Sequence, residues 1–203
     1  MTAVDTQTIH RVMHEIKRRK LEVLRVVDLT PRMRRITLGG PELAGFISLG
    51  SDDHIKLLFA NNAEEQAAMD AVDLPREGVK PTMREYTPRR IDLVNNELDL
   101  DFVLHGDGPA STWAEQARPG QFLHIGGPRG SMIVPDMFDS YLLIGDETAI
   151  PAIARRLEGL AANRRALVII EVENGAEQQK LDSPAQVNVI WVLRDGGKNN
   201  LLT

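Results

Sequence analysis

The sequence has no cysteine among its 203 residues. This absence excludes disulfides, thiol nucleophiles, thiolate zinc sites and cysteine-ligated iron–sulfur clusters. If the protein transfers electrons, they must therefore reside on a bound organic cofactor. Histidine is also sparse: the five residues are scattered, and no acidic partner completes a set of metal ligands around them, so we expect no metal site.

A long apolar run and an excess of positive charge are absent as well. No stretch approaches the roughly 18 to 20 apolar residues that cross a bilayer, and residues 1–20 contain no apolar signal core. Lys and Arg number 24 against 29 Asp and Glu, which gives a formal net charge of −5. We therefore expect no membrane insertion, no nucleic-acid partner and a cytoplasmic protein in which any anion site is local.

Short alternating segments separated by turn residues fill residues 21–135. They predict antiparallel strands, and Asn95–Asn96 suits a tight hairpin turn between two of them. Residues 108–117 are typical of a short helix. About six strands this close together, with one inserted helix, predict a six-stranded antiparallel β-barrel domain. Residues 1–20 are expected to precede it as a polar arm or helix.

The hydrophobic period changes after about Pro135. Residues 141–144, 166–172 and 187–193 are nearly continuous apolar runs, and a helical apolar face separates the first two. Such runs predict a parallel sheet buried on both faces. We therefore expect an α/β domain of the NAD(P)H-binding kind over residues 136–203. Because a three-stranded sheet of this kind normally continues, we also expect the chain to be an incomplete version of a longer protein.

The segment MREYTPRR, residues 83–90, concentrates three arginines around one tyrosine. A flavin dinucleotide needs a guanidinium fork for its pyrophosphate and a flat side chain beside its ring system. Arg84 can supply the fork, and Tyr86 points to the same face of a strand. Thr87 can hydrogen-bond the ring, and Pro88 stiffens the exit. Taken singly, these residues also fit a surface ion pair and a core aromatic.

The glycine-rich turn GDGPASTWA offers the second half of such a site. Gly106, Gly108 and Ala110 let the backbone come close to an anion. Ser111 and Thr112 lie where a hydroxyl and N–H groups at a helix start would meet phosphate. Alone, the segment also fits an ordinary turn with Ser111 as a helix cap. Together and in this order, the two segments predict FAD binding.

Four motifs, REYTPR, DFVLHGDGPASTWA, GGPRGS and LLIGDETAIPAI, occur in an order and spacing that resemble the siderophore-interacting protein family. These are FAD-dependent ferric-siderophore reductases related to the ferredoxin-reductase superfamily, and the likeness covers about residues 21–193. It implies an oxidoreductase that releases iron by reducing Fe(III) to Fe(II) in the chelate. It also implies a set of cofactor-binding residues: Arg84, Tyr86, Thr87, Val103, His105, Gly108, Ala110, Ser111, Trp113, Asp146 and Thr148.

The turn GDETAIP, residues 145–151, differs from the GxGxxG turn that binds a dinucleotide. Asp146 and Glu147 place negative charge at the helix N-terminus that a nicotinamide pyrophosphate would use. We therefore expect weak or unconventional NAD(P)H binding, with NAD(P)H or another donor such as reduced ferredoxin supplying the electrons.

The implied substrate, a ferric siderophore or other ferric chelate, is bulky and usually anionic or polar. It needs an open, cationic approach to the flavin edge, and Lys56 and Arg129 lie on barrel segments that can flank it. Either residue also fits an ordinary surface charge. Two alternatives stay open at this point: a ferredoxin-reductase-like flavoprotein that passes electrons to a protein partner, and a non-catalytic barrel that serves as a binding module.

Overall fold

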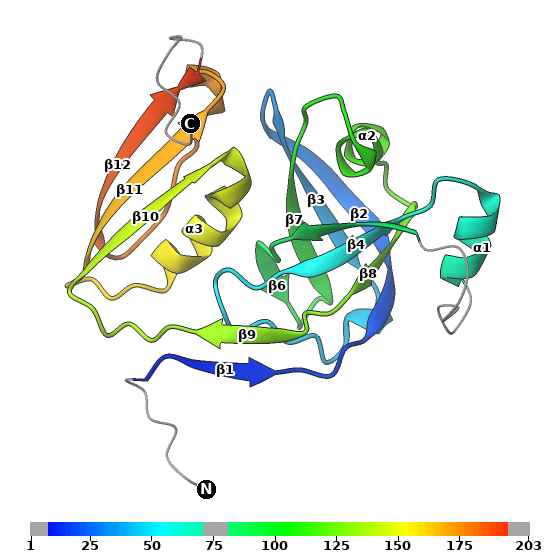
Figure 1. Cartoon of the computed structure of the whole chain (residues 1–203), viewed down its shortest axis with the longest axis horizontal. Helices are drawn as coiled ribbons and strands as arrows, with labels where there is room; N and C mark the ends of the chain where they lie inside the picture. The colour runs from blue at the N-terminus through cyan, green and yellow to red at the C-terminus, as the bar shows by residue number, and fades with distance from the viewer. Residues whose placement is uncertain (1–7, 71–80, 195–203) are drawn as a thin grey trace, which may run out of the picture.

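The structure, a computed structural model, describes residues 8–70 and 81–194 (Figure 1). Its larger part is an antiparallel sheet of seven strands in the order β5-β4-β8-β2-β3-β7-β6. These strands are β2 (Arg18–Thr30), β3 (Met33–Gly39), β4 (Ile55–Phe59), β5 (Thr82–Tyr86), β6 (Arg90–Asp92), β7 (Glu97–Val103) and β8 (Phe122–Gly126). Three helical segments accompany them: η1 (Pro41–Leu43), α1 (Ala63–Asp70) and α2 (Pro109–Gln116).

The two end strands of this sheet, β5 and β6, are parts of one bent strand. Thr87, Pro88 and Arg89 separate them; Pro88 has no N–H to donate to a neighbouring strand, and the Arg89 N–H donates to the Asp99 carbonyl at 2.8 Å. Before the bend the strand pairs with β4, and after it with β7. The bent strand therefore closes the sheet on itself, and the predicted six-stranded barrel is confirmed in this form.

The barrel interior is filled by the inward side chains of alternating strand positions. Leu21 and Val23 of β2 are fully buried, as are Ile36 and Leu38 of β3. Helix α2 covers one end, where the Trp113 ring lies 5.7 Å from the Phe102 ring between centroids. The apolar residues that alternate along the sequence thus point inward and form one continuous core.

The N-terminal segment pairs with the barrel as a strand. β1 (His10–Met13) runs antiparallel to β9 (Gly130–Ile133). The helical alternative for residues 1–20 is therefore wrong where the structure describes them. Pairing with β1 gives the backbone groups along one edge of β9 hydrogen-bond partners, which a separate helix would not provide.

The second unit is a parallel sheet of three strands in the order β10 (Ser140–Asp146), β11 (Arg165–Val172) and β12 (Gln186–Leu193). Helix α3 (Ile150–Glu158) follows the short helix η2 (Glu147–Ala149) and packs on the sheet through buried Ile150, Ile153 and Leu157. A third short helix, η3 (Gly175–Glu177), follows β11. The predicted α/β unit is confirmed. No helix within residues 8–70 or 81–194 is long and apolar enough to cross a membrane.

The expectation that this sheet is buried on both faces is wrong for the described residues. Leu142, Ile144 and Ile190 are 60%, 50% and 43% exposed. The strand register places Ile144, Ile169 and Ile190 side by side. Helix α3 packs against the opposite face, so the continuous apolar runs reflect one packed face and one apolar face open to solvent.

Removing the Phe102 ring tests the barrel core. We expect Phe102→Ala to lower the free energy of unfolding by about 3–5 kcal/mol, because it removes a fully buried ring that also contacts Tyr86 and Trp113. Urea denaturation followed by circular dichroism measures this. The control Val94→Ala, at a side chain 92% exposed, should change it by less than about 0.5 kcal/mol; equal effects of the two variants would contradict the assigned core.

Candidate functional site at the domain junction

A cleft of about 640 Å³ lies between the barrel and the α/β unit. Its barrel wall comes from β5, the end of β7 and the start of α2. Its other wall comes from the turn after β10 and the residue that follows β12. Ten of the eleven residues that the sequence implicates in cofactor binding line this one cleft: Arg84, Tyr86, Thr87, Val103, His105, Gly108, Ala110, Ser111, Asp146 and Thr148.

Trp113, the eleventh residue, lines an adjoining cavity of about 530 Å³. Its indole ring packs on Phe59, with ring centroids 6.0 Å apart. Arg84, Gly108 and Pro109 line both spaces. FAD is a long molecule with a diphosphate between its two ring systems, so two adjoining cavities with an arginine between them fit its shape.

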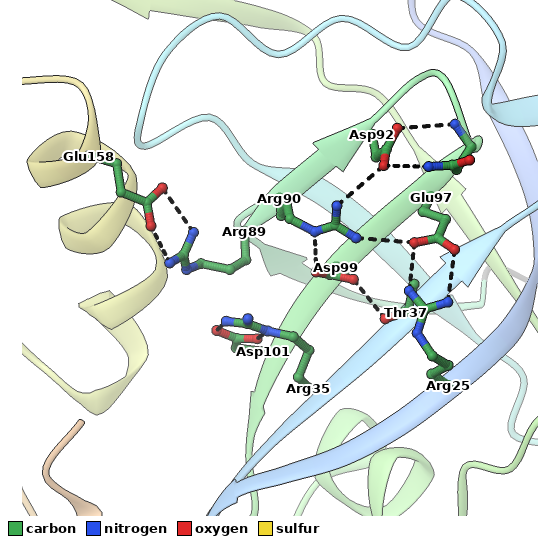
Figure 2. Close-up of polar contacts among 11 residues, drawn as sticks. Arg25, Arg35, Thr37, Arg89, Arg90, Asp92, Glu97, Asp99, Asp101 and Glu158 are labelled. Carbon is green, nitrogen blue, oxygen red and sulfur yellow. Dashed lines mark hydrogen bonds and ion pairs between the residues drawn. The ribbon is translucent and has the colours of Figure 1, made fainter. Parts of the chain in front are cut away.

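Arg84 is the arginine of segment 83–90 that can bind an anion. It is exposed on β5, and its guanidinium donates one hydrogen bond, of 2.9 Å, to the Met83 carbonyl. Arg89 and Arg90 are instead paired with carboxylates: Arg89 reaches Glu158 at 2.5 Å and Arg90 reaches Asp99 at 2.8 Å (Figure 2). Among the described residues, Arg84 has no ion-pair partner, so its charge is available for phosphate.

Tyr86 presents a neutral aromatic side chain to the cleft. Its ring lies 4.5 Å from the Phe102 ring between centroids, and burial raises the pKa of the phenol to about 12. The phenol therefore remains protonated at neutral pH. A half-buried flat side chain of this kind suits contact with an isoalloxazine ring.

The start of α2 supplies backbone donors beside Arg84. Gly108 precedes the helix with φ +93°, and the first helical residue, Pro109, has no N–H. The buried Ser111 hydroxyl accepts from the His105 N–H at 3.0 Å and donates to the Glu115 carboxylate at 3.4 Å. Since the hydroxyl is already bonded, contact of this residue with a phosphate would fall to its backbone N–H, one of the unpaired donors at a helix start.

On the opposite wall, the two acids of the turn have partners of their own. Asp146 accepts from the Thr148 N–H at 2.9 Å and from the Thr148 hydroxyl at 2.5 Å. Glu147 forms an ion pair with Arg194, which also lies 3.3 Å from Glu171. The first turn of this helical segment is thus capped by its own side chain, which removes part of the anion site that a nicotinamide pyrophosphate uses elsewhere.

Arg194 is a cleft residue that the sequence analysis missed. It follows the last residue of β12, at the carboxyl edge of the parallel sheet. Ligands of open α/β sheets bind outside this edge. The position of Arg194 directly after a predicted parallel strand could therefore have identified it as a cleft residue. Glu85, Asp101 and Asp107 of the barrel wall were missed as well.

Lys56 and Arg129 do not line the cleft. Lys56 is exposed on β4, and its ammonium lies 2.9 Å from the Glu85 carboxylate, which does line it. Lys56 pairs across the sheet with Gly126, three residues before Arg129. Lys56 therefore lies beside the cleft, while Arg129 lies in the segment between β8 and β9.

Polar contacts across the junction hold the two walls in place. Arg89, at the bend between β5 and β6, reaches Glu158 on α3 (Figure 2). Arg155 of α3 donates to the Ser48 hydroxyl at 3.1 Å and to the Ser48 carbonyl. Beside them, the barrel wall is stiffened by the paired contacts of Arg35 with Asp101, at 2.7 and 2.8 Å.

An antiparallel barrel joined to a parallel α/β unit, with a cleft between them, is the fold of the ferredoxin-reductase-like flavoproteins. The Amycolatopsis cytochrome P450 reductase GcoB shares it, with a TM-score of 0.60 at 21% identity over 90% of this chain and 53% of that chain. The siderophore utilization protein from T. fusca superimposes with a TM-score of 0.84 at 38% identity, over 94% of this chain and 74% of that one.

The sequence comparisons identify the family within this fold. The siderophore-interacting FAD-binding domain matches residues 22–132, and the siderophore-interacting protein domain matches residues 138–203. The chain belongs to the siderophore-interacting protein family. It is 38% identical to the NADPH-dependent ferric-chelate reductase of Escherichia coli over 91% of this chain and 75% of that protein. It is 34% identical to the ferric vibriobactin reductase ViuB of Vibrio cholerae, over 87% and 67% respectively.

The turn before α2 can be tested by adding one methyl group. Gly108→Ala should lower the free energy of unfolding by about 1–3 kcal/mol, because φ +93° strains any residue with a Cβ. The added Cβ would lie 3.7 Å from the His105 ring, an ordinary contact, so strain and not collision causes the loss. Thermal and urea unfolding measure it. Gly126→Ala is the matched control, since its Cβ meets nothing within 4 Å; a loss confined to Gly126→Ala would refute this reading.

Proposed function

We propose that this protein is an FAD-dependent ferric-siderophore reductase, which releases iron by reducing Fe(III) to Fe(II) in the chelate. The observation that carries the proposal is the single cleft that gathers Arg84, Tyr86 and the start of α2 on one wall. The names of the relatives, a ferric-chelate reductase and a ferric vibriobactin reductase, support it.

Different residues of the cleft would bind different parts of the cofactor. The Arg84 guanidinium and the backbone N–H groups at the start of α2 would hold the diphosphate. Tyr86 and Thr87 would contact the ring system, and Trp113 would face the adenosine half in the adjoining cavity. Held by these residues, FAD would supply the redox chemistry, a two-electron uptake from the donor coupled to one-electron reduction of Fe(III).

No side chain has to act as nucleophile or general base in this reaction. The walls of the cleft position the cofactor, and they leave an edge through which a bulky chelate can approach. After reduction the chelator binds Fe(II) more weakly than Fe(III), so the metal dissociates.

For the electron donor we propose NAD(P)H, in line with the name of the Escherichia coli relative. Because Asp146 and Thr148 bond each other, we expect the donor's pyrophosphate to bind by contacts other than those of a GxGxxG turn. We further propose that the reaction takes place in the cytoplasm, where the nicotinamide pool is found.

The phosphate role of Arg84 predicts a loss of cofactor on substitution. Arg84→Ala should weaken FAD binding about 10- to 150-fold, since it removes a charge-assisted contact of about 1.5–3 kcal/mol. Titration of the apoprotein with FAD, followed by flavin fluorescence, measures the dissociation constant. Arg118→Ala removes another exposed arginine, beyond the end of α2, as the control. Unchanged FAD affinity in Arg84→Ala would show that the diphosphate binds elsewhere.

The reductase activity is tested without any nicotinamide donor. FAD-loaded protein is reduced chemically under anaerobic conditions and mixed with a ferric siderophore, while flavin absorbance and a ferrous chelator dye are followed. We expect prompt return of oxidised flavin and two Fe(II) per flavin. Protein that binds FAD but is not reoxidised would instead favour electron transfer to a protein partner. Protein that takes up no FAD would favour a non-catalytic barrel module.

A further inference from the structure

The acidic side chain Glu85 lies between a lysine and a histidine at the rim of the cleft. Strands β4 and β5 place it directly opposite Lys56, and the Lys56 ammonium lies 2.9 Å from the Glu85 carboxylate. The His54 ring nitrogen is 3.9 Å from the same carboxylate oxygen. Glu85 and Lys56 are both about half exposed, so the pair forms in contact with solvent. Glu85 also lines the cleft, beside Arg84.

The charges that line the cleft are mostly negative. Two arginines, Arg84 and Arg194, face five carboxylates: Glu85, Asp101, Asp107, Asp146 and Glu147. Arg194 is paired with Glu147, and the proposed function assigns Arg84 to the cofactor diphosphate. An incoming chelate therefore finds no unpaired arginine among these lining residues. The Lys56 ammonium beside the cleft is itself already neutralised by Glu85.

We propose that Glu85 determines substrate specificity: by neutralising Lys56, it makes the cleft discriminate against polyanionic ferric chelates and accept neutral ones. This inference rests on the proposed function and names the substrate class of the same site. A trianionic tris-catecholate complex has to compete with Glu85 for Lys56. It is also repelled by Asp107 and Asp146, since Asp101 and Glu147 are paired with Arg35 and Arg194. A neutral tris-hydroxamate complex of similar size neither competes with Glu85 for Lys56 nor is repelled by carboxylates.

The pair also persists at the pH at which such a reductase works. The hydrogen bond from Lys56, helped by the charges of His54 and Lys56, holds the pKa of Glu85 below its ordinary value. The carboxylate is therefore ionised throughout the neutral range. The discrimination should weaken at high salt, because both partners are exposed to solvent.

Binding of redox-inert complexes tests the proposal without the influence of iron potentials. The ligands are the Ga(III) complexes of a tris-catecholate, a trianion, and of a tris-hydroxamate, a neutral complex. Isothermal titration calorimetry on the FAD-loaded full chain gives the dissociation constants. Glu85→Gln keeps the shape of the side chain and removes its charge. We expect the variant to bind the trianion about five- to tenfold more tightly and the neutral complex with less than a twofold change.

Two further variants identify the cause. Asp182→Asn removes the acid of another exposed pair, Lys180–Asp182 at 2.6 Å, and should change neither constant. In a Lys56→Met background, the gain from Glu85→Gln should fall by at least half, since no masked cation remains to be released. Flavin absorbance confirms equal FAD content in every variant.

The outcomes separate the two proposals. If neither complex binds FAD-loaded wild-type protein, the proposed function fails. If the complexes bind but Glu85→Gln affects both equally, or affects neither, the specificity role of Glu85 is refuted. If Glu85→Gln still increases the affinity for the trianion by the full factor in the Lys56→Met background, Glu85 does not act by neutralising Lys56.

Discussion

The bend between β5 and β6 is the constraint on which the rest of the structure depends. Because Pro88 cannot donate a backbone hydrogen bond, the strand leaves β4 at this point and continues along β7. The bend closes the barrel and sets Thr87 in the wall of the cleft. It also points Arg89 toward Glu158 on α3 (Figure 2). One interruption of a strand thus couples barrel closure to the position of the second unit.

The arginines of this region show how a net-acidic protein can present a local anion site. Arg89 and Arg90 form ion pairs with carboxylates, and these ion pairs stabilise the fold. Arg84 lacks such a partner among the described residues, and it lies beside the open start of a helix. A guanidinium that has no carboxylate partner and the unpaired N–H groups of a helix start both attract phosphate, so together they bind it more strongly than either would alone. The net charge of the whole chain therefore says little about this cleft.

The two walls of the cleft contribute different chemistry. The barrel wall offers the half-buried aromatic ring of Tyr86 together with the exposed Arg84. The α/β wall offers a turn in which Asp146 accepts from Thr148 and Glu147 pairs with Arg194. The barrel wall is thus open to a ligand, while the turn of the α/β wall is largely occupied by its own contacts. Family membership and this asymmetry agree with a flavoprotein whose donor site departs from the usual dinucleotide fingerprint.

The sequence by itself determined the local features. Alternation of apolar residues specified the barrel strands, and the segments around Arg84 and GDGPAST each carried a local prediction of ligand contact, because these patterns depend on residues close in the chain. Only the tertiary structure decided the rest. Arg194 enters the cleft through the parallel order of three strands, and Glu85 meets Lys56 through strand register. Helix α3 packs on one face of the parallel sheet, and apolar side chains on the other face are exposed. These features join distant segments, and pairing and packing, which no local pattern records, bring them together.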